Sequence, residues 1–327
     1  MSDSNDNFWV KRYGYTCHAD IGKILHIDGL GDNDYYNPTL CELDGTKLLA
    51  FRMEPRNSDW RFPGCYKPSI AFADQTNGSW RLVTTPGLLP MLEDPSFLIA
   101  KLNGQNKPIL GGVRIERKSA DVFVPSTEFY TGDSLLTLNK TPFAIVAGMK
   151  DVHLLQLPDS RFLLCRRPSG GKFHEGRISL HVIDNLDALA RLDTLDLPTL
   201  GVLGSGFVTD WVGTNDLCLL RDSNNVEWVG LIGHLGSALH DDTRHYAATI
   251  YKIKLESLLD DKVHHIMPKI IATRACFEDG PSKLETLQDV VFPGSLEPLG
   301  NERYRLWAGL SDTRVGTIIV DDPFEIR

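Results

Sequence analysis

The sequence predicts an all-β protein, and more specifically a five-bladed β-propeller. Three observations lead to this prediction. Short β-branched and aromatic runs are broken by Gly, Asn and Asp, and helical periodicity is scarce. Five segments also share one pattern, in which an Asp or Asn precedes an apolar strand, a hairpin turn and a second, more apolar strand. Radial repetition of such units is typical of propellers. The segments begin at Asn37, Asp94, Asp151, Asp216 and Asp289.

Each unit contains a turn whose residues suit a β-hairpin, since Gly, Asn and Asp accept the backbone angles that tight turns require. A hairpin alone is marginally stable, so the rest of each unit should supply outer strands. We place single helical turns at 186–192 and 255–261. The expected turns are at 44–45, 103–104, 158–160, 222–225 and 300–301. The expected outer strands are 69–73 with 80–83, then 120–124, 177–183, 247–253 and 316–320.

The units divide the chain into five blades of one domain that spans residues 1–327. The last unit is short of sequence, and the segment 22–28 is spare at the other end, so we expect it to join the last blade and close the ring. A β-sandwich with mutually similar strands is the alternative, whereas a parallel α/β fold lacks the amphipathic helices it needs. The blade bounds are about 32–90, 91–145, 146–203, 204–275 and 285–327 plus 22–28.

Composition narrows the classes of partner. A net charge of −9 disfavours nucleic acid and anionic lipid, and no apolar run is long enough to cross a bilayer. The N-terminus is polar and has no secretory pattern, and the six cysteines are widely spaced with no CxxC pair. We therefore expect a cytoplasmic protein with reduced cysteines. No spacing of His or Cys matches a metal site, so we expect no metal and no cofactor.

The repeat predicts where a functional site would form. Equivalent positions of the innermost strands cluster around a propeller axis, so the five leading residues should form a ring at one mouth of the channel. Several carboxylates in one concave site raise each other's pKa, and the resulting spread of pKa values suits acid–base catalysis. The alternative is that each Asp only caps a turn through local hydrogen bonds.

The ends of the second strands should face the same mouth and add charged groups to it. Carboxylates among Arg, His and aromatic side chains suit a neutral polyol, because hydroxyls take charge-assisted hydrogen bonds and aromatic faces cover a sugar ring. Alternatively, the arginines only neutralise the acids and close the channel. The second strands contribute Arg52, Glu54, Arg114, Glu116, Arg166, Arg167, His234 and Asp312, and the aromatic candidates are Tyr35, Tyr36, Trp60, Trp211 and Tyr246.

Several short motifs, taken in order, resemble glycoside hydrolase family 130, the β-mannoside phosphorylases and hydrolases. A still closer resemblance is to a family of five-bladed propellers that is known only as a domain of unknown function. The resemblance covers all five blades, from about residue 27 to 324. The motifs include 36–38 (YNP), 92–95 (LEDP), 148–151 (GMKD), 233–234 (GH), 289–294 (DVVFPG) and 306–312 (LWAGLSD).

The resemblance implies a sugar site on the propeller axis. It assigns the general acid to Asp94. For hydrolysis we expect a second carboxylate, Asp151, Asp289 or Glu54, to activate the attacking water. One departure concerns phosphate: the family commonly has Arg after Glu-Asp-Pro, whereas this chain has Ser96, so a bidentate anion ligand is missing. The resemblance and the repeat together assign sugar or phosphate contacts to Asn37, Arg52, Glu54, Arg114, Lys150, Arg167, Asp216, His234, Tyr246 and Asp312.

The expected function is cleavage of a glycosidic bond, by water or by phosphate, on a carbohydrate such as a β-mannoside. Two alternatives stay open: a non-catalytic glycan-binding propeller with a decayed site, and a propeller that binds other proteins. Fold alone does not decide among them, because propellers host many functions. The sequence also leaves homo-oligomerisation open.

Overall fold

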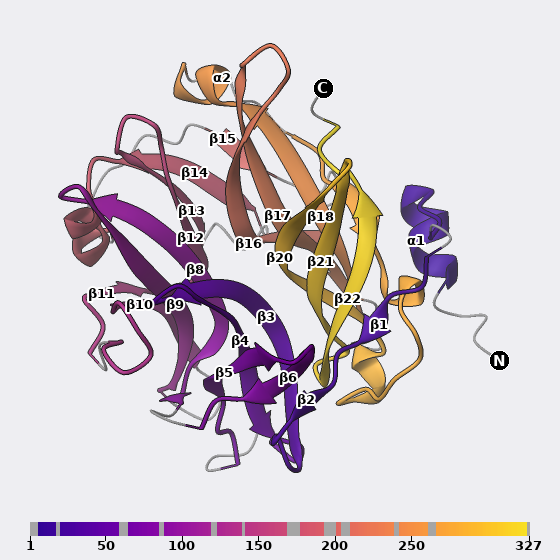
Figure 1. Cartoon of the computed structure of the whole chain (residues 1–327). Coiled ribbons are helices and arrows are strands. Elements are labelled where there is room, and N and C mark those ends of the chain that lie inside the picture. The colour runs from indigo at the N-terminus through magenta and orange to yellow at the C-terminus, as the bar shows by residue number, and fades with distance from the viewer. Residues whose placement is uncertain are drawn as a thin grey trace.

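The computed structural model describes residues 6–17, 20–58, 65–84, 88–118, 123–138, 141–168, 177–192, 201–203, 210–238, 242–260 and 266–325. Within these ranges β-strands dominate, which confirms the all-β prediction. No helix among the described residues has the length and apolar character needed to cross a membrane. The strands form four hydrogen-bonded sheets, and we treat the largest as two groups, so that five groups are described below. Figure 1 shows them arranged around a common centre.

In the first three groups, strands that follow one another in sequence pair with one another, except that the fifth strand of group one pairs with the third. Group one contains β3 (Asn33–Leu43), β4 (Thr46–Pro55), β5 (Ser69–Thr76), β6 (Ser79–Leu82) and β7 (Leu89–Pro90). Group two contains β8 (Glu93–Leu102), β9 (Gln105–Arg117), β10 (Phe123–Thr131) and β11 (Ala144–Ala147). Group three contains β12 (Met149–Gln156), β13 (Phe162–Pro168), β14 (Ile178–Ile183) and β15 (Gly201–Leu203).

The last two groups share one hydrogen-bonded sheet. They are joined where β18 pairs in parallel with β20, at His245 opposite Asp289. Group four contains β16 (Asp210–Arg221), β17 (Glu227–Ala238), β18 (Arg244–Lys254) and β19 (Lys269–Ala272). Group five contains β20 (Asp289–Gly300), β21 (Arg303–Leu310) and β22 (Arg314–Asp321).

The N-terminal segment connects the last group with the first. The strand β1 (Lys23–Ile24) pairs with β22, as we expected for the spare segment 22–28. The next strand, β2 (Ile27–Asp28), departs from that expectation, because it pairs in parallel with β6 of group one. The segment therefore binds to both groups.

Short helices lie between and outside the strands. The helical turns predicted near 186 and 255 are present as η2 (Leu186–Arg191) and α2 (Leu255–Leu259). The turns η3 (Arg274–Cys276) and η4 (Glu285–Leu287) were not predicted. Nor was the N-terminal helix α1 (Asp6–Tyr13), which lies at the outer edge of the molecule in Figure 1.

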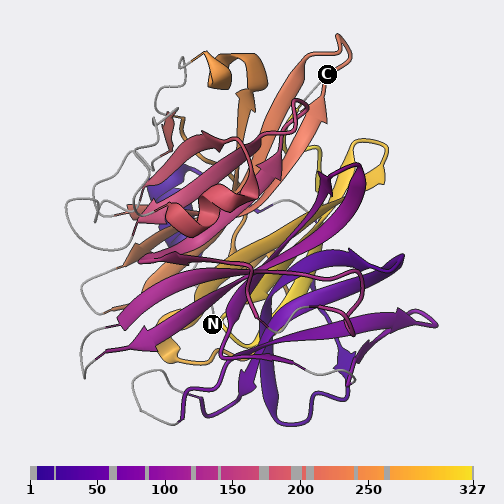
Figure 2. The same cartoon turned by 90° about the vertical axis from the view of Figure 1, so that its left-hand side faces the viewer.

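The five hairpins join the first and second strand of each group, and each turn contains a residue with positive φ, as the sequence predicts. In the first, Asp44 and Gly45 have φ of 52° and 68°. Figure 2 shows these hairpin turns projecting to one side of the molecule, its right-hand side in that view. The starts of the first strands and the ends of the second strands consequently lie on the opposite side.

Hydrophobic side chains fill the spaces between neighbouring groups. Separate buried clusters join groups one and two, two and three, three and four, and four and five. A fifth cluster joins group five to group one, where the rings of Trp80 and Trp307 meet edge to face with centroids 5.6 Å apart. Packing thus runs from each group to the next and back to the first.

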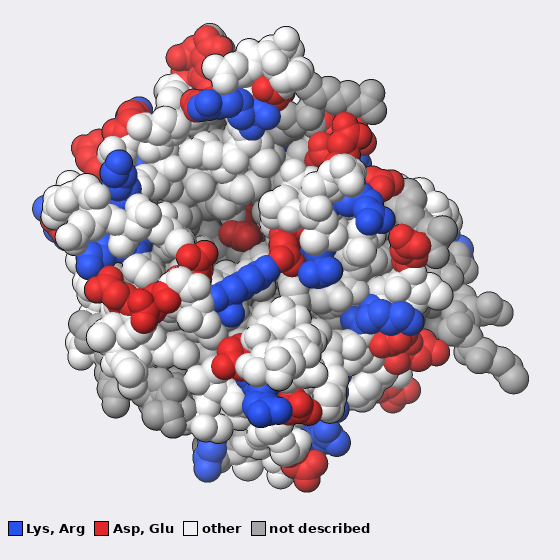
Figure 3. Space-filling model, viewed as in Figure 1, with Lys and Arg blue, Asp and Glu red and all other residues white. Residues whose placement is uncertain are grey.

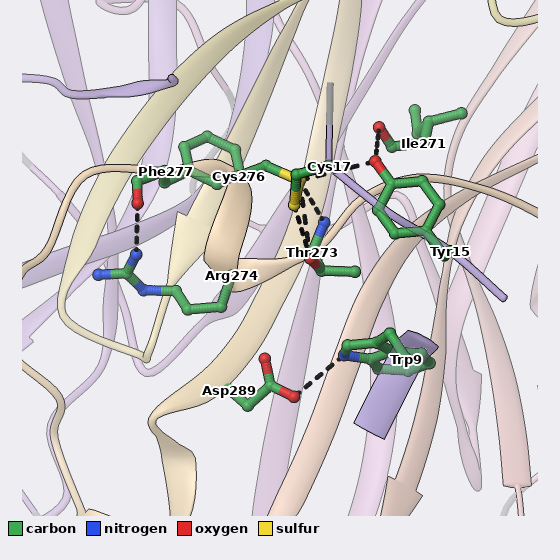
Figure 4. The surroundings of a disulfide bond; sticks show 9 residues. All are labelled: Trp9, Tyr15, Cys17, Ile271, Thr273, Arg274, Cys276, Phe277 and Asp289. Carbon is green, nitrogen blue, oxygen red and sulfur yellow. Dashed lines mark hydrogen bonds between the residues drawn. A yellow bond between two sulfur atoms is a disulfide. The ribbon is translucent and has the colours of Figure 1, made fainter. Parts of the chain in front are cut away.

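One disulfide bond contradicts the expectation that all cysteines are reduced. Cys17 and Cys276 are bonded, with their Cα atoms 5.4 Å apart and 259 positions between them in sequence (Figure 4). Wide spacing in sequence does not exclude a disulfide, because the bond depends on the distance between the two residues in the folded chain. Cys41, Cys65, Cys165 and Cys218 are free thiols.

Candidate functional site

Three of the five predicted leading residues lie around one cavity. In the first three groups, the pairing of the first and second strands is interrupted just after Tyr36, Glu93 and Lys150. The residues that follow, Asn37, Asp94 and Asp151, have φ of 49°, 46° and 56°. Asn and Asp tolerate this left-handed conformation better than other side chains do. All three line one cavity, together with Asn215 and Gly294 of the last two groups.

In groups four and five, the residues at the equivalent interruption in strand pairing are not the ones that we predicted. The pairing is interrupted after Thr214 and after Pro293, so the residues that follow are Asn215 and Gly294. Both line the same cavity. The prediction that Asp216 and Asp289 are equivalent to Asn37, Asp94 and Asp151 is therefore wrong. The sequence comparison aligned the nearest acidic residue of each repeat, whereas the equivalent position is the one at the bulge.

Asp216 lines a second cavity, further along the first strands and closer to the hairpin turns. Figure 3 views the hairpin side of the molecule, which is hollowed at its centre and has acidic side chains within the hollow. Burial raises the pKa of Asp216 to about 7, although the N–H of Leu217 donates to its carboxylate at 2.8 Å. His153 and Ser96 line both cavities.

Asp289 does not line the cavity but fixes α1 to the strands. Its Oδ2 accepts hydrogen bonds from Trp9 Nε1 at 3.0 Å and from His245 Nδ1 at 2.6 Å. Phe8 stacks on the His245 ring at 3.9 Å between centroids. Burial raises the pKa of Asp289, and its two hydrogen-bond donors oppose that rise. Its environment is that of a structural anchor.

The charges near Asp94 converge on one arginine. Arg52 Nη1 donates to Glu93 Oε2 at 3.0 Å and lies 3.6 Å from Asp94 Oδ1, while Nη2 lies 3.4 Å from Glu54 Oε1. Asn37 Nδ2 donates to Asp94 Oδ1 at 2.7 Å. The guanidinium also lies over the ring of Tyr36, 4.9 Å from its centroid. We call Arg52, Glu54, Glu93 and Asp94 the Arg52 cluster.

Lys283 brings a second cation to this cluster. Its ammonium group and the Tyr36 hydroxyl both donate to Glu54 Oε1. Burial raises the pKa of Glu54, but Arg52 and Lys283 outweigh burial and leave that pKa below its usual value. The pKa of Asp312 is raised by burial and by nearby acids, despite the same two cations. Asp312 therefore lies within electrostatic reach of the cluster.

A second arginine organises the other side of the cavity. Arg167 Nη2 forms an ion pair with Asp151 Oδ2 at 2.9 Å, and Nη1 lies 3.3 Å from His234 Nε2. His234 Nδ1 lies 2.9 Å from Asn215 Oδ1. We call Asp151, Arg167, Asn215 and His234 the Arg167 cluster. Burial alone would raise the pKa of Asp151, but Arg167 and neighbouring cations lower it below its usual value.

His234 is neutral, and its surroundings fix its tautomer. Burial lowers its pKa to about 3, so the ring carries one proton at neutral pH. Since Arg167 can only donate, Nε2 accepts and Nδ1–H donates to Asn215. A Cβ atom at Gly213 would lie 2.1 Å from His234 Cε1, so only glycine leaves room for the ring. Phe292 stacks on His234 at 4.7 Å, and Tyr246 lies 5.4 Å away.

Other predicted residues divide between the cavity and positions elsewhere. Lys150 contributes to the electrostatic environment of both Glu93 and Asp151, and it forms no ion pair with a carboxylate among the residues described. Arg114 instead pairs with Glu128 at 2.5 Å, and Arg166 donates to His181 at 2.9 Å. Trp211 packs against Tyr246 with centroids 5.5 Å apart. Tyr35 donates to a backbone carbonyl, Glu116 pairs with Lys118, and Trp60 lies outside the described residues.

Four residues of the site were not predicted from the sequence. Glu93 precedes Asp94 in the motif that carried the resemblance, and its position alone could have marked it. Asn215 could have been found by comparing amides as well as acids across the repeat. Lys283 lies in a connection between groups four and five, where no repeat pattern reaches. His153 follows Asp151 by two positions, the alternation expected for one face of a strand.

No group of three potential His, Cys, Asp or Glu ligands for a metal ion occurs in the part of the chain that the structure describes. The chemistry available in and around the cavity is that of carboxylates, two arginines, two lysines and two histidines, His153 and His234, whose lowered pKa values keep them neutral. Such groups can hold hydroxyls through charge-assisted hydrogen bonds and can exchange protons.

Solved structures share this fold. A GDP-Man-dependent mannosyltransferase from Leishmania mexicana, MPT-1, has 24% identity and a TM-score of 0.74, and the match covers 96% of this chain and 93% of that one. A mannose phosphorylase from the same organism, MPT-4, solved in complex with phosphate ion, has 24% identity and a TM-score of 0.73, with 96% and 91% covered. A β-1,2-mannobiose phosphorylase from Listeria innocua has 12% identity and a TM-score of 0.57, with 91% and 94% covered.

Curated proteins offer no sequence match to this chain. One protein-family model matches the sequence over residues 16–326, which is nearly the whole chain and includes every residue of the cavity described above. The chain therefore belongs to the family described as "Protein of unknown function (DUF1861)".

Proposed function

We propose that this protein is a carbohydrate-active enzyme that cleaves a glycosidic bond, with Asp94 as general acid, in the axial cavity of a five-bladed propeller. The observation that carries the proposal is the cavity itself. Asn37, Asp94 and Asp151 come from three different strand groups and meet around one space, flanked by two arginine-centred clusters.

The fold proposal is that the five strand groups are five blades of one domain, 1–327, with β1 completing the last blade. Two observations support it. The five hydrophobic clusters connect the groups in a cycle, and the segment 22–28 pairs with both the last group and the first. A closed ring leaves only short strand edges exposed, which limits edge-to-edge association.

Asp94 suits the role of acid by its access to the cavity. Its side chain is 18% exposed, whereas that of Asp151 is 5% exposed. The hydrogen bond from Asn37 Nδ2 to Asp94 Oδ1 fixes the orientation of the carboxyl group. A general acid must be held within hydrogen-bonding reach of the leaving oxygen, and such catalysis contributes about 10²–10⁴-fold to a rate.

Asp151 suits the role of base when water is the nucleophile. Its lowered pKa keeps it a carboxylate at neutral pH, and the ion pair with Arg167 holds it in place. Asp289 is a poor candidate for this role, because it is 1% exposed and bonded to Trp9 and His245. Hydrolysis would then use the Asp94–Asp151 pair.

Phosphorolysis is the second candidate reaction. Two observations count against phosphate binding. Ser96 stands where glycoside hydrolase family 130 commonly has an arginine, and Arg52 and Arg167 already pair with carboxylates. Lys150 favours phosphate nonetheless, since it forms no ion pair with a carboxylate within the described ranges. The mannose phosphorylase MPT-4, solved in complex with phosphate ion, is among the similar structures.

The test is incubation of the purified protein with manno-oligosaccharides, with and without inorganic phosphate. Free mannose in both conditions indicates hydrolysis, and mannose 1-phosphate that requires phosphate indicates phosphorolysis. GDP-mannose belongs in the panel because MPT-1 is a GDP-Man-dependent transferase. Failure to turn over any member of a broad glycoside panel would contradict the proposal. Sugar binding that persists in inactive protein would instead support the glycan-binding alternative.

A further inference from the structure

Glu93 and Asp94 are consecutive residues, yet both carboxyl groups approach one nitrogen atom. Side chains of neighbouring residues in a strand normally point to opposite faces. Here the pairing of β8 with β9 is interrupted after Glu93, and Asp94 has φ of 46°. The interruption turns the Asp94 side chain, so that Arg52 Nη1 lies 3.0 Å from Glu93 Oε2 and 3.6 Å from Asp94 Oδ1.

The charges around this nitrogen do not balance. Lys283 is bonded to Glu54, which leaves one guanidinium to face both Glu93 and Asp94. Lys150 on β12 contributes a more distant positive charge, whereas Asp312 contributes a negative one. The side chains of Glu93 and Arg52 are 11% and 13% exposed, so water offers little screening. Two neighbouring carboxylates in such a place favour uptake of a proton.

We propose that Glu93 and Asp94, whose carboxyl groups both face Arg52, together hold one proton. In this proposal Glu93 is the positioning residue that keeps the proton available to Asp94 at neutral pH. The inference rests on the proposed function for its catalytic consequence. The proton sharing itself is independent of any reaction.

The pKa of Glu93 agrees with the geometry. Burial raises it to about 7, and the charges of Asp94 and Glu54 add to the rise, while Arg52 and Lys150 oppose it. Because an isolated Glu titrates near 4.3, the pair would otherwise lose its last proton well below neutral pH. Sharing extends the pH range in which a proton is present next to the cavity.

The catalytic step then balances as follows. The bond between the anomeric carbon and the glycosidic oxygen breaks, both electrons stay on the oxygen, and the shared proton passes from Asp94 to that oxygen. Water attaches to the anomeric carbon and gives its proton to Asp151. The pair is left with two negative charges beside Arg52, which favours uptake of a new proton, so the proton on Asp151 returns through solvent to the pair.

The first experiment needs no substrate. Protein labelled with ¹³C at the carboxyl carbons of Glu is titrated by NMR, and one resonance is expected to titrate near pH 7, to vanish in Glu93→Gln and to titrate at lower pH in Asp94→Asn. A matched control is Glu297→Gln, which removes a partly buried Glu that also accepts from an arginine, Arg305. That control should keep the resonance. A Glu93 resonance that titrates below pH 5 would overturn the proposal.

The second experiment uses activity. Glu93→Gln should lower the upper pH limit of kcat/KM by about one unit and reduce kcat at pH 7.5 about 10-fold or more, with KM changed less than about threefold. Glu93→Asp should retain the pH limit of the parent protein, which a purely structural role would not require. An unchanged pH profile in folded Glu93→Gln overturns the inference and leaves the proposed function intact. Absence of activity in the parent protein contradicts the proposed function alone.

Discussion

The two arginine clusters of the cavity use the same residue types in opposite ways. In the Arg52 cluster, three carboxyl groups surround one guanidinium, and Lys283 neutralises only one of them. In the Arg167 cluster, one carboxylate faces one guanidinium, and the remaining partner is a neutral histidine. The first cluster is short of positive charge and the second is balanced.

This difference predicts a division of labour. A cluster with excess negative charge takes up and releases protons readily, because each protonation state is close in free energy. A balanced, buried pair resists titration and holds its shape. We therefore expect changes at Arg52, Glu93 and Asp94 to alter rates and pH profiles, whereas changes at the partners of Asp151, namely Arg167 and His234, should alter mainly stability and substrate binding.

The largest expected effect tests the catalytic side of this comparison. Asp94→Asn removes the proposed acid but keeps the size of the side chain and the tolerance of positive φ. We expect kcat to fall by about 10²–10⁴-fold while substrate affinity stays within a few-fold. Steady-state kinetics and calorimetric titration with the same oligosaccharide measure the two quantities. Asp133→Asn, at an exposed ion pair with Lys107, is the control. A parallel loss of affinity would argue against the acid role.

The next effect tests the structural side. Arg167→Met leaves the buried carboxylate of Asp151 without its partner, and we expect the free energy of unfolding to fall by about 3–5 kcal/mol. Urea denaturation followed by fluorescence provides the measurement. Arg221→Met breaks an exposed pair with Glu227 and should cost less than about 1 kcal/mol. Equal losses in the two variants would contradict the idea that the Arg167 cluster stabilises the fold.

Trp9 of helix α1 packs against residues of groups three and four, which carry the Arg167 cluster, so the anchors of this helix sharpen the comparison. Trp9→Phe removes the donor to the buried Asp289 and should destabilise the protein by about 1.5–3 kcal/mol. Since His245 precedes Tyr246, we also expect weaker substrate binding with little change in kcat. The matched control is Trp228→Phe, whose indole donates to Asp222 in a hairpin turn on the other side of the molecule. If both variants lose similar stability, α1 does not act through this anchor.

The last effect depends on pH and is small near neutral pH. The folded chain lowers the pKa of His234 to about 3, against about 6.5 in the unfolded chain. The unfolded state therefore binds more protons between those values, so the contribution of this residue is complete above pH 6.5 and is lost as pH falls toward 3. The loss is about 1.4 kcal/mol per pH unit. In His234→Asn the unfolding free energy should fall less steeply between pH 6 and 4, whereas His26→Asn, at an exposed position, should match the parent protein.

The sequence predicted the strands, the hairpins and three residues of the cavity, because each depends on local backbone preferences. A turn at Asp44-Gly45 and a bulge at Asp94 follow from residues adjacent in the chain. Asp289 was wrongly predicted to line the cavity, because a comparison of sequences alone does not show where the hydrogen-bond register between strands shifts. Helix α1, the Cys17–Cys276 bond and the role of Lys283 could not be predicted, since each depends on segments that meet only after the chain has folded.

The left-handed backbone at Asn37, Asp94 and Asp151 has a consequence for how such a site can change over time. Asn and Asp occupy this conformation at nearly equal cost, whereas valine or isoleucine would be strained there. Substitutions at these three points can therefore exchange an amide for an acid without straining the backbone. New chemistry in the cavity can arise by steps that the fold itself tolerates.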